Sequence, residues 1–198
     1  IVLTHGHFDH VGSLEPLLKE WNVPVYAHEH EIPYLNGELD YPKGDPKADG
    51  GLVSKLSPLY PHHGIDITPY LNPLPSNGEI PYMEGWNWIH TPGHTPGHVS
   101  LYRERDGVLI AGDAFVTVKQ ESLYRVVLQQ KEISGPPKYF TMDWEEARKS
   151  VAKLADLHPT LAVTGHGEEM AGEELEAALK KLVENFDQIA LPANRKPH

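Results

Sequence analysis

Apolar residues along this chain follow two spacings, one typical of strands and one typical of helices. Short apolar runs predict strands at 1–3, 23–27, 86–90, 99–103, 108–111 and 161–164. Helical spacing of apolar residues predicts helices over 11–21, from Asp143 to Ala155, and over 173–189. Strands separated by such helices predict an α/β protein with two sheets between two helix layers and a site at one sheet edge.

Turn and cap signals sharpen three of these predictions. Asp9 stands where the N-terminal cap of the first helix is expected, and Asp143 followed by Glu146 predicts a capped start for the second. Asp106-Gly107 between two strand-like runs predicts a tight hairpin. That hairpin leads directly to Asp113.

The region 33–81 differs in composition from the rest of the chain. It holds nine prolines, together with Gly50-Gly51 and the pair His62-His63, and it cannot form long regular structure. We expect an insertion within one domain spanning 1–198, and expect it to form part of a substrate rim, with His62 and His63 exposed to solvent. The sequence shows neither internal repeats nor low-complexity tracts.

Composition limits the partners and the chemistry. Of 198 residues, 39% are hydrophobic, and 28 acidic against 17 basic residues give a net charge of −11, which disfavours nucleic acid. Because the sequence has no apolar run of 18 residues, we expect no membrane partner. We also expect a cytoplasmic location, with which a sequence lacking cysteine is compatible. The absence of cysteine leaves nitrogen and oxygen ligands, which favour zinc, manganese or iron.

The densest chemical signal is Thr4-His5-Gly6-His7-Phe8-Asp9-His10. Three imidazoles and a carboxylate lie within six residues, directly after a strand-like run. Side chains alternate in an extended segment, so His5 and His7 can face one ion while Asp9 and His10 follow the turn of the chain. A divalent cation would satisfy this cluster.

Three later segments place histidine or aspartate beside glycine after a strand-like run. They are Thr91-Pro92-Gly93-His94-Thr95-Pro96-Gly97-His98, Gly112-Asp113 and Gly165-His166-Gly167. We expect them to meet the first motif at one sheet edge. A further patch, His28-Glu29-His30-Glu31, suggests a third metal site, but a solvated helix start is the favoured interpretation.

These motifs together resemble the metallo-β-lactamase-fold hydrolases, through T-H-x-H-x-D-H, T-P-G-H-T-x-G-H, G-D and a late G-H. The resemblance implies a four-layer αββα sandwich and two metal ions. It assigns His5, His7 and His94 to one ion, Asp9, His10 and His166 to the other, and Asp113 to both, while His98 lies outside the ligand set. Domains of this fold begin with several strands before the first motif, so we expect the N-terminal part of the domain to be missing here.

The resemblance also implies a chemistry. A hydroxide between two divalent ions, zinc first with manganese or iron as alternatives, would attack the ester, thioester or lactone bond of a small molecule. Asp113 would set the spacing of the ions, and Asp9 would orient the nucleophile or carry a proton. The alternatives are an iron-dependent sulfur dioxygenase, a phosphodiesterase and a non-catalytic metal-binding domain.

Two further expectations concern the substrate. Asp113 resembles the bridging residue of family members that cleave thioesters, lactones or phosphoesters, although Phe115 stands where lactonases of acyl homoserines have tyrosine. No basic cluster suggests a glutathione site. We expect 112–124 to form pocket wall, and core packing rather than substrate contact for the following aromatic residues: Tyr102, Tyr124, Tyr139 and Phe140.

Overall fold

The computed structural model describes residues 1–48, 55–118 and 131–196. Its largest sheet has five strands in the order β3-β4-β5-β8-β9. The bounds are Asn87–His90 for β3, Val99–Arg103 for β4, Val108–Gly112 for β5, Leu161–Thr164 for β8 and Met170–Ala171 for β9. β5 and β8 are parallel and the other neighbours are antiparallel.

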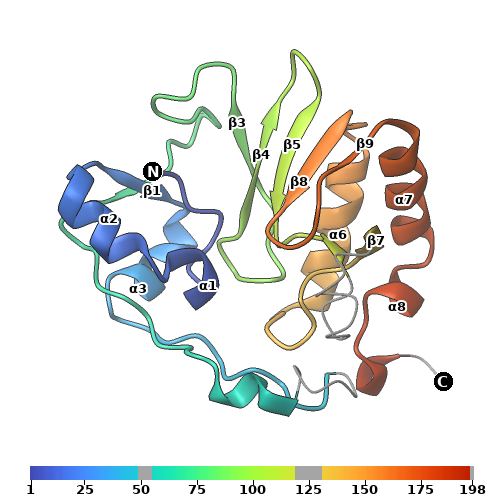
Figure 1. Cartoon of the computed structure of the whole chain (residues 1–198), viewed down its shortest axis with the longest axis horizontal. Coiled ribbons are helices and arrows are strands. Elements are labelled where there is room, and N and C mark those ends of the chain that lie inside the picture. The colour runs from blue at the N-terminus through green and yellow to red at the C-terminus, as the bar shows by residue number, and fades with distance from the viewer. Residues whose placement is uncertain (49–54, 119–130, 197–198) are drawn as a thin grey trace.

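Two helices cover one face of this sheet. They are α6 (Trp144–Ala155) and α7 (Gly172–Glu184), followed by the short α8 (Phe186–Ile189). Figure 1 shows α6 and α7 lying along this face of the sheet. Leu109 and Ala162 of the sheet share a buried core with Val151, Leu154 and Leu175 of the helices. The apolar stripes read from the sequence are therefore the faces that pack on the sheet.

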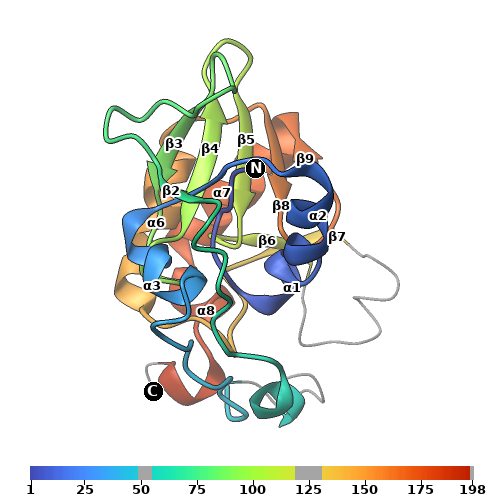
Figure 2. The same ribbon diagram turned by 90° about the vertical axis from the view of Figure 1, so that its left-hand side faces the viewer.

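The opposite side carries a smaller sheet and its own helices. β1 (Val25–Ala27) pairs in parallel with β2 (Leu71–Pro73), and the apolar stripe of α2 (Leu14–Trp21) packs against β1. α1 (Phe8–Val11) and α3 (Ile32–Leu35) complete this layer, and α1 to α3 stand in front of the large sheet in Figure 2.

A third apolar cluster lies between the two sheets. Tyr26 of β1 and Leu74, which follows β2, pack with Val99, Leu101 and Trp88 of the large sheet. The order helix, sheet, sheet, helix confirms the expected αββα sandwich. A further two-stranded sheet pairs β6 (Val116–Val118) with β7 (Lys131–Ser134). Among the described residues, no helix has both the length and the apolar character that crossing a membrane requires.

The element bounds correct several predictions. The helix expected over 11–21 is two helices broken at Gly12-Ser13, and Asp9 lies inside α1 rather than at a cap. The helix expected over 173–189 breaks at Asn185 into α7 and α8. Residues 1–3 form only one bridge, between Val2 and Tyr26. The strand β2 lies in the proline-rich region, but it has only three residues and agrees with the expectation that this region forms no long regular structure.

Other local predictions are confirmed. Oδ1 of Asp143 accepts the backbone N–H groups of Glu145 and Glu146, so it caps α6. The hairpin of β4 and β5 turns through Gly107, whose φ is +67°. Tyr124 lies outside the described residues, as do the other residues of 119–124 in the segment expected to form pocket wall.

Candidate metal centre

Four separate segments bring the seven expected ligand residues together at one edge of the large sheet. His5 and His7 lie in the loop before α1, and Asp9 and His10 lie in α1 itself. His94 follows β3, Asp113 directly follows β5, and His166 follows β8. The parallel pairing of β5 and β8 explains why Asp113 and His166 meet, because their strand ends lie side by side.

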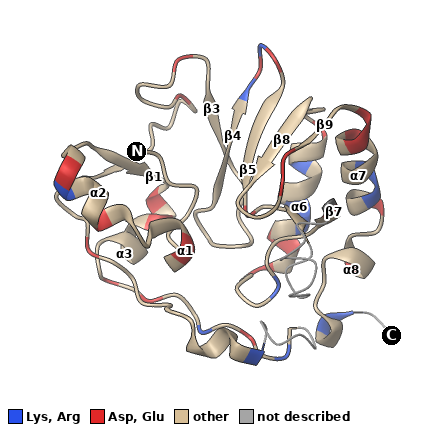
Figure 3. Cartoon of the chain, viewed as in Figure 1, with Lys and Arg blue, Asp and Glu red and all other residues tan. Residues whose placement is uncertain are grey.

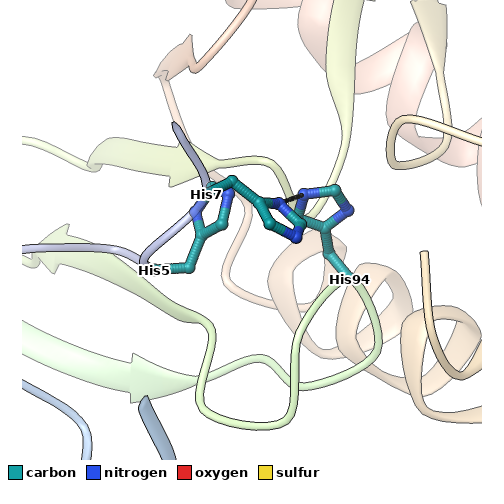
Figure 4. Close-up of side chains that lie close together, drawn as sticks. All are labelled: His5, His7 and His94. Atoms are coloured by element: carbon teal, nitrogen blue, oxygen red, sulfur yellow. Dashed lines mark hydrogen bonds between the residues drawn. The ribbon is translucent and has the colours of Figure 1, made fainter. Parts of the chain in front are cut away.

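The first triad consists of His5, His7 and His94, all three buried. One ring nitrogen from each lies within 4.8 Å of the others. Nδ1 of His7 and Nε2 of His94 are 2.9 Å apart, the contact drawn in Figure 4. His94 Nδ1 is held by the hydroxyl of Thr141 at 3.2 Å, which leaves Nε2 directed into the triad.

The second triad consists of Asp9, His10 and His166, whose ligand atoms also lie within 4.8 Å of one another. Asp113 lies between the two triads. Its Oδ2 is 3.4 Å from Nε2 of His94, and it is 3.5 Å and 3.4 Å from Nε2 of His10 and of His166. This one carboxylate therefore reaches histidines of both triads.

Buried polar atoms without partners show that the residues fit a metal ion. Among the described residues, Nε2 of His5, Nε2 of His10 and Oδ1 of Asp113 are buried and lack a hydrogen-bond partner. Leaving such atoms unpaired costs about 1–3 kcal/mol each. All three belong to the predicted ligand set, and imidazole nitrogen with carboxylate oxygen is a donor set that suits zinc, manganese and iron.

The protonation equilibria show how strongly the site favours positive charge. Burial lowers the pKa of His10 and of His166, yet the Asp113 carboxylate outweighs this effect, and the pKa of His166 rises to about 10. Burial raises the pKa of Asp113, but contacts with His10 and His166 hold it well below its usual range. Protons on these histidines thus balance the carboxylates when no cation does.

The first triad behaves differently. Burial holds the pKa of His5 and His94 well below the ordinary value, and it lowers the pKa of His7 to about 4. Neutral imidazoles are the form that binds metal. The two triads therefore differ in charge, with a neutral buried set and a more exposed set that includes a carboxylate.

A close backbone approach at Gly165 helps to place Asp113. A Cβ at position 165 would lie 2.0 Å from Oδ1 of Asp113 and 2.9 Å from Cε1 of His10. Only glycine leaves room for both groups, which explains the Gly-His dipeptide of the sequence motif.

His98 lies behind the centre rather than in either triad. Its Nε2 accepts the backbone N–H of Asp113 at 2.9 Å, and its Nδ1 contacts the hydroxyl of Thr91 at the same distance. Burial lowers the pKa of His98 to about 3, so the ring is neutral at pH 7. His98 therefore holds the backbone of the shared carboxylate, in keeping with its place outside the expected ligand set.

Glu31 is the main residue that sequence reasoning missed. It was expected in a solvated helix start, and a short 3-10 turn does begin here at Glu29, but Glu31 is fully buried. Its carboxylate accepts hydrogen bonds from backbone and side-chain donors of both histidine loops. Burial raises its pKa. No local pattern separates Glu31 from exposed Glu29, because the partners of Glu31 are 10 to 66 residues away in the sequence.

A second histidine cluster forms where His90 meets His28 and His30, with ligand atoms within 4.8 Å of one another. The rings of His28 and His90 stack at 4.1 Å with 9° between their planes. A metal ion lies near the plane of each imidazole that binds it, and two nearly parallel planes share no such point. This geometry favours the interpretation without a third metal site. His63 is exposed and pairs with Asp40.

Aromatic side chains line one flank of the first triad. The ring of Phe140 packs against that of His7, with 5.1 Å between the ring centres. Three further rings contact Phe140 itself, at 6.1, 6.2 and 4.9 Å between ring centres: those of Phe8, Tyr60 and Tyr139. All four are only partly buried. Tyr102 instead packs against the core beneath the sheet, as expected.

Comparison with known proteins identifies the family. The family model described as the metallo-beta-lactamase superfamily matches residues 1–166. The chain belongs to this superfamily. The "Probable metallo-hydrolase YflN" of Bacillus subtilis (strain 168) is 50% identical over 189 residues, which cover 96% of this chain and 72% of YflN.

Two more distant relatives bear on the metal and the reaction. The crystal structure of TTHA1623 in a di-iron-bound form matches with a TM-score of 0.56 and 26% identity, covering 86% of this chain and 71% of that one. "Hydroxyacylglutathione hydrolase GloC" of Haemophilus influenzae is 29% identical over 118 residues, which cover 57% of this chain and 48% of GloC.

Proposed function

We propose that this chain is the metal-binding part of a hydrolase that cleaves an ester, thioester or lactone bond of a small molecule. The observation that carries the proposal is Asp113, a buried carboxylate placed within 3.5 Å of histidines from both triads. The names of YflN, a probable metallo-hydrolase, and GloC, a hydroxyacylglutathione hydrolase, support hydrolysis as the reaction class.

We further propose that the centre takes two divalent ions. His5, His7 and His94 would hold one ion, Asp9, His10 and His166 the other, and Asp113 would contact both. When bound, the ions would supply a Lewis acid for the carbonyl oxygen and would acidify a water molecule, lowering its pKa to about 7. Zinc, manganese and iron all suit this donor set, and TTHA1623 is an example with iron.

The side chains around the ions would have separate roles in the reaction. Asp9 has a 34% exposed side chain against 2% for Asp113, so Asp9 is the carboxylate that can pass a proton to a departing group in contact with solvent. Asp113 is held by His98 and fixes the spacing of the triads. The partly exposed rings of Phe8, Tyr60, Tyr139 and Phe140 offer an apolar wall that can orient an acyl group.

Charge supports a small neutral or weakly charged substrate over a nucleic acid. The net charge is −11. The helix α1 carries the acidic Asp9 of the second triad in its first turn. Within the described residues, basic positions are dispersed over α2, α6, α7, the tip of the β4–β5 hairpin and the loops at the bottom of the view rather than gathered at α1 (Figure 3). A polyanion would gain little electrostatic binding energy at this surface.

A substrate screen tests the proposal. Protein loaded with zinc, manganese or iron is assayed on a lactone, a p-nitrophenyl ester and an acyl thioester, beside bis(p-nitrophenyl) phosphate and a persulfide with oxygen uptake. We expect acyl hydrolysis that chelator abolishes, and that Asp113→Ala loses while the exposed Asp106→Ala retains it. Turnover confined to the phosphodiester or to persulfide oxidation would overturn the reaction class.

A further inference from the structure

Glu31 lies under the metal centre without belonging to either triad. It is fully buried at the end of the 3-10 turn Glu29–Glu31, which follows β1. Four donors converge on its carboxylate: the backbone N–H groups of Gly6 and Gly97 and the hydroxyl groups of Tyr41 and Thr95. Every partner is a donor, so the carboxylate is used fully as an acceptor.

Three of the four donors come from the two loops that carry the first triad. Gly6 stands between His5 and His7, and its N–H donates to Oε2 of Glu31 at 3.1 Å. Thr95 directly follows His94, and its hydroxyl donates to Oε1 at 2.6 Å. The N–H of Gly97 donates to the same Oε1 at 2.9 Å. One carboxylate thus links the two loops whose histidines face one another in Figure 4.

Close packing makes this link rigid. A Cβ at Gly97 would lie 2.6 Å from the backbone nitrogen of Glu31, so the second loop approaches Glu31 as closely as a backbone can. Tyr41 donates its hydroxyl to Oε2 and places its ring 4.4 Å from that of His7. Hydrogen bonds to a buried carboxylate are charge-assisted and strong, which suits a fixed spacer between two loops.

We propose that Glu31 is a positioning residue that sets the separation of His5 and His7 from His94, and so tunes the affinity of the first triad for its metal ion. The second triad contains no residue adjacent to these four donors, so its affinity depends much less on Glu31. The inference rests on the proposed metal occupancy but not on the identity of the substrate.

Glu31→Gln tests this role with little change of shape. Glutamine places an NH2 group where one oxygen was, so one backbone N–H, of either Gly6 or Gly97, must face another donor. Removing a residue that orients metal ligands lowers metal affinity about 10–100-fold. The matched control is Glu29→Gln, an exposed glutamate in the same turn.

The readout is competitive zinc titration with a chromophoric chelator, without substrate. For Glu31→Gln we expect one of two ions to weaken about 10–100-fold while the other changes little, and we expect Glu29→Gln to match the wild type. Equal zinc affinities in Glu31→Gln and wild type, even with a lower melting temperature, would show a purely structural role and overturn the proposal.

A second set of variants covers the case in which Glu31→Gln does not fold. The double variant Tyr41→Phe, Thr95→Val removes two donors and keeps the carboxylate with both backbone N–H groups. We expect the same selective loss at one ion, and wild-type affinity at both ions would contradict the proposal. Because no substrate enters the titration, absence of acyl hydrolysis would refute the proposed reaction without touching this result.

Discussion

Gly165→Ala tests whether Asp113 must lie where the structure places it. The added Cβ would lie 2.0 Å from Oδ1 of Asp113, whereas ordinary van der Waals contact begins at 3.4 Å. The carboxylate or the strand end must therefore move by roughly 1 Å. Misplacement of this size costs about 100-fold in rate, and overpacking costs about 1–3 kcal/mol of stability.

The assay combines kcat/KM on the best acyl substrate, bound metal by elemental analysis, and thermal unfolding. The control is Gly78→Ala, which adds backbone strain because φ is +85° but meets no atom within 4 Å. We expect Gly165→Ala to lose activity and metal while Gly78→Ala loses only stability. Wild-type kcat/KM and metal content in Gly165→Ala would refute the placement of Asp113.

Three further predictions follow from the site. His98→Ala should lower activity about 10–100-fold with both ions retained, whereas Asp113→Ala should lower activity further and release metal. Equal losses of activity with equal metal contents would show that Asp113 is not shared by the two ions. Phe140→Ala should lower kcat/KM for a hexanoyl ester about 10-fold more than for an acetyl ester, and an unchanged ratio would remove the aromatic wall from the substrate site. Burial lowers the pKa of His28 to about 4, so between pH 6.5 and 4 the unfolded chain binds a proton at His28 that the folded chain does not. The free energy of unfolding, measured with chelator, should therefore fall as the pH falls from 6.5 to 4, and it should fall less in His28→Gln. Identical pH slopes in the two proteins would contradict a neutral, buried His28.

The ligand positions could be predicted because each sits in a short motif at a strand end. The spacing of His5 and His7, and the glycines beside Asp113 and His166, are local signals, and the structure brings all seven residues together. Whether each binds metal remains a prediction. The apolar stripes of α6 and α7 were equally readable, because burial against one sheet imposes helical spacing.

What the sequence could not show depends on distant contacts. Glu31 resembles exposed Glu29 until the chain folds and brings Gly6 and Gly97 to it. The meeting of His90 with His28 likewise joins the last residue of β3 to the residue that follows β1. The helix breaks at Gly12-Ser13 and Asn185 were hidden because apolar spacing continues across both of them. β2 is short, and its pairing with β1 decides its existence more than its own residues do.

Anomalous diffraction from crystals grown with zinc tests the central claim most directly. The proposed centre predicts two peaks about 3.5–4 Å apart, one beside His5, His7 and His94 and one beside Asp9, His10 and His166, with the Asp113 carboxylate between them. A single peak, or none at these residues, would contradict a two-metal hydrolase.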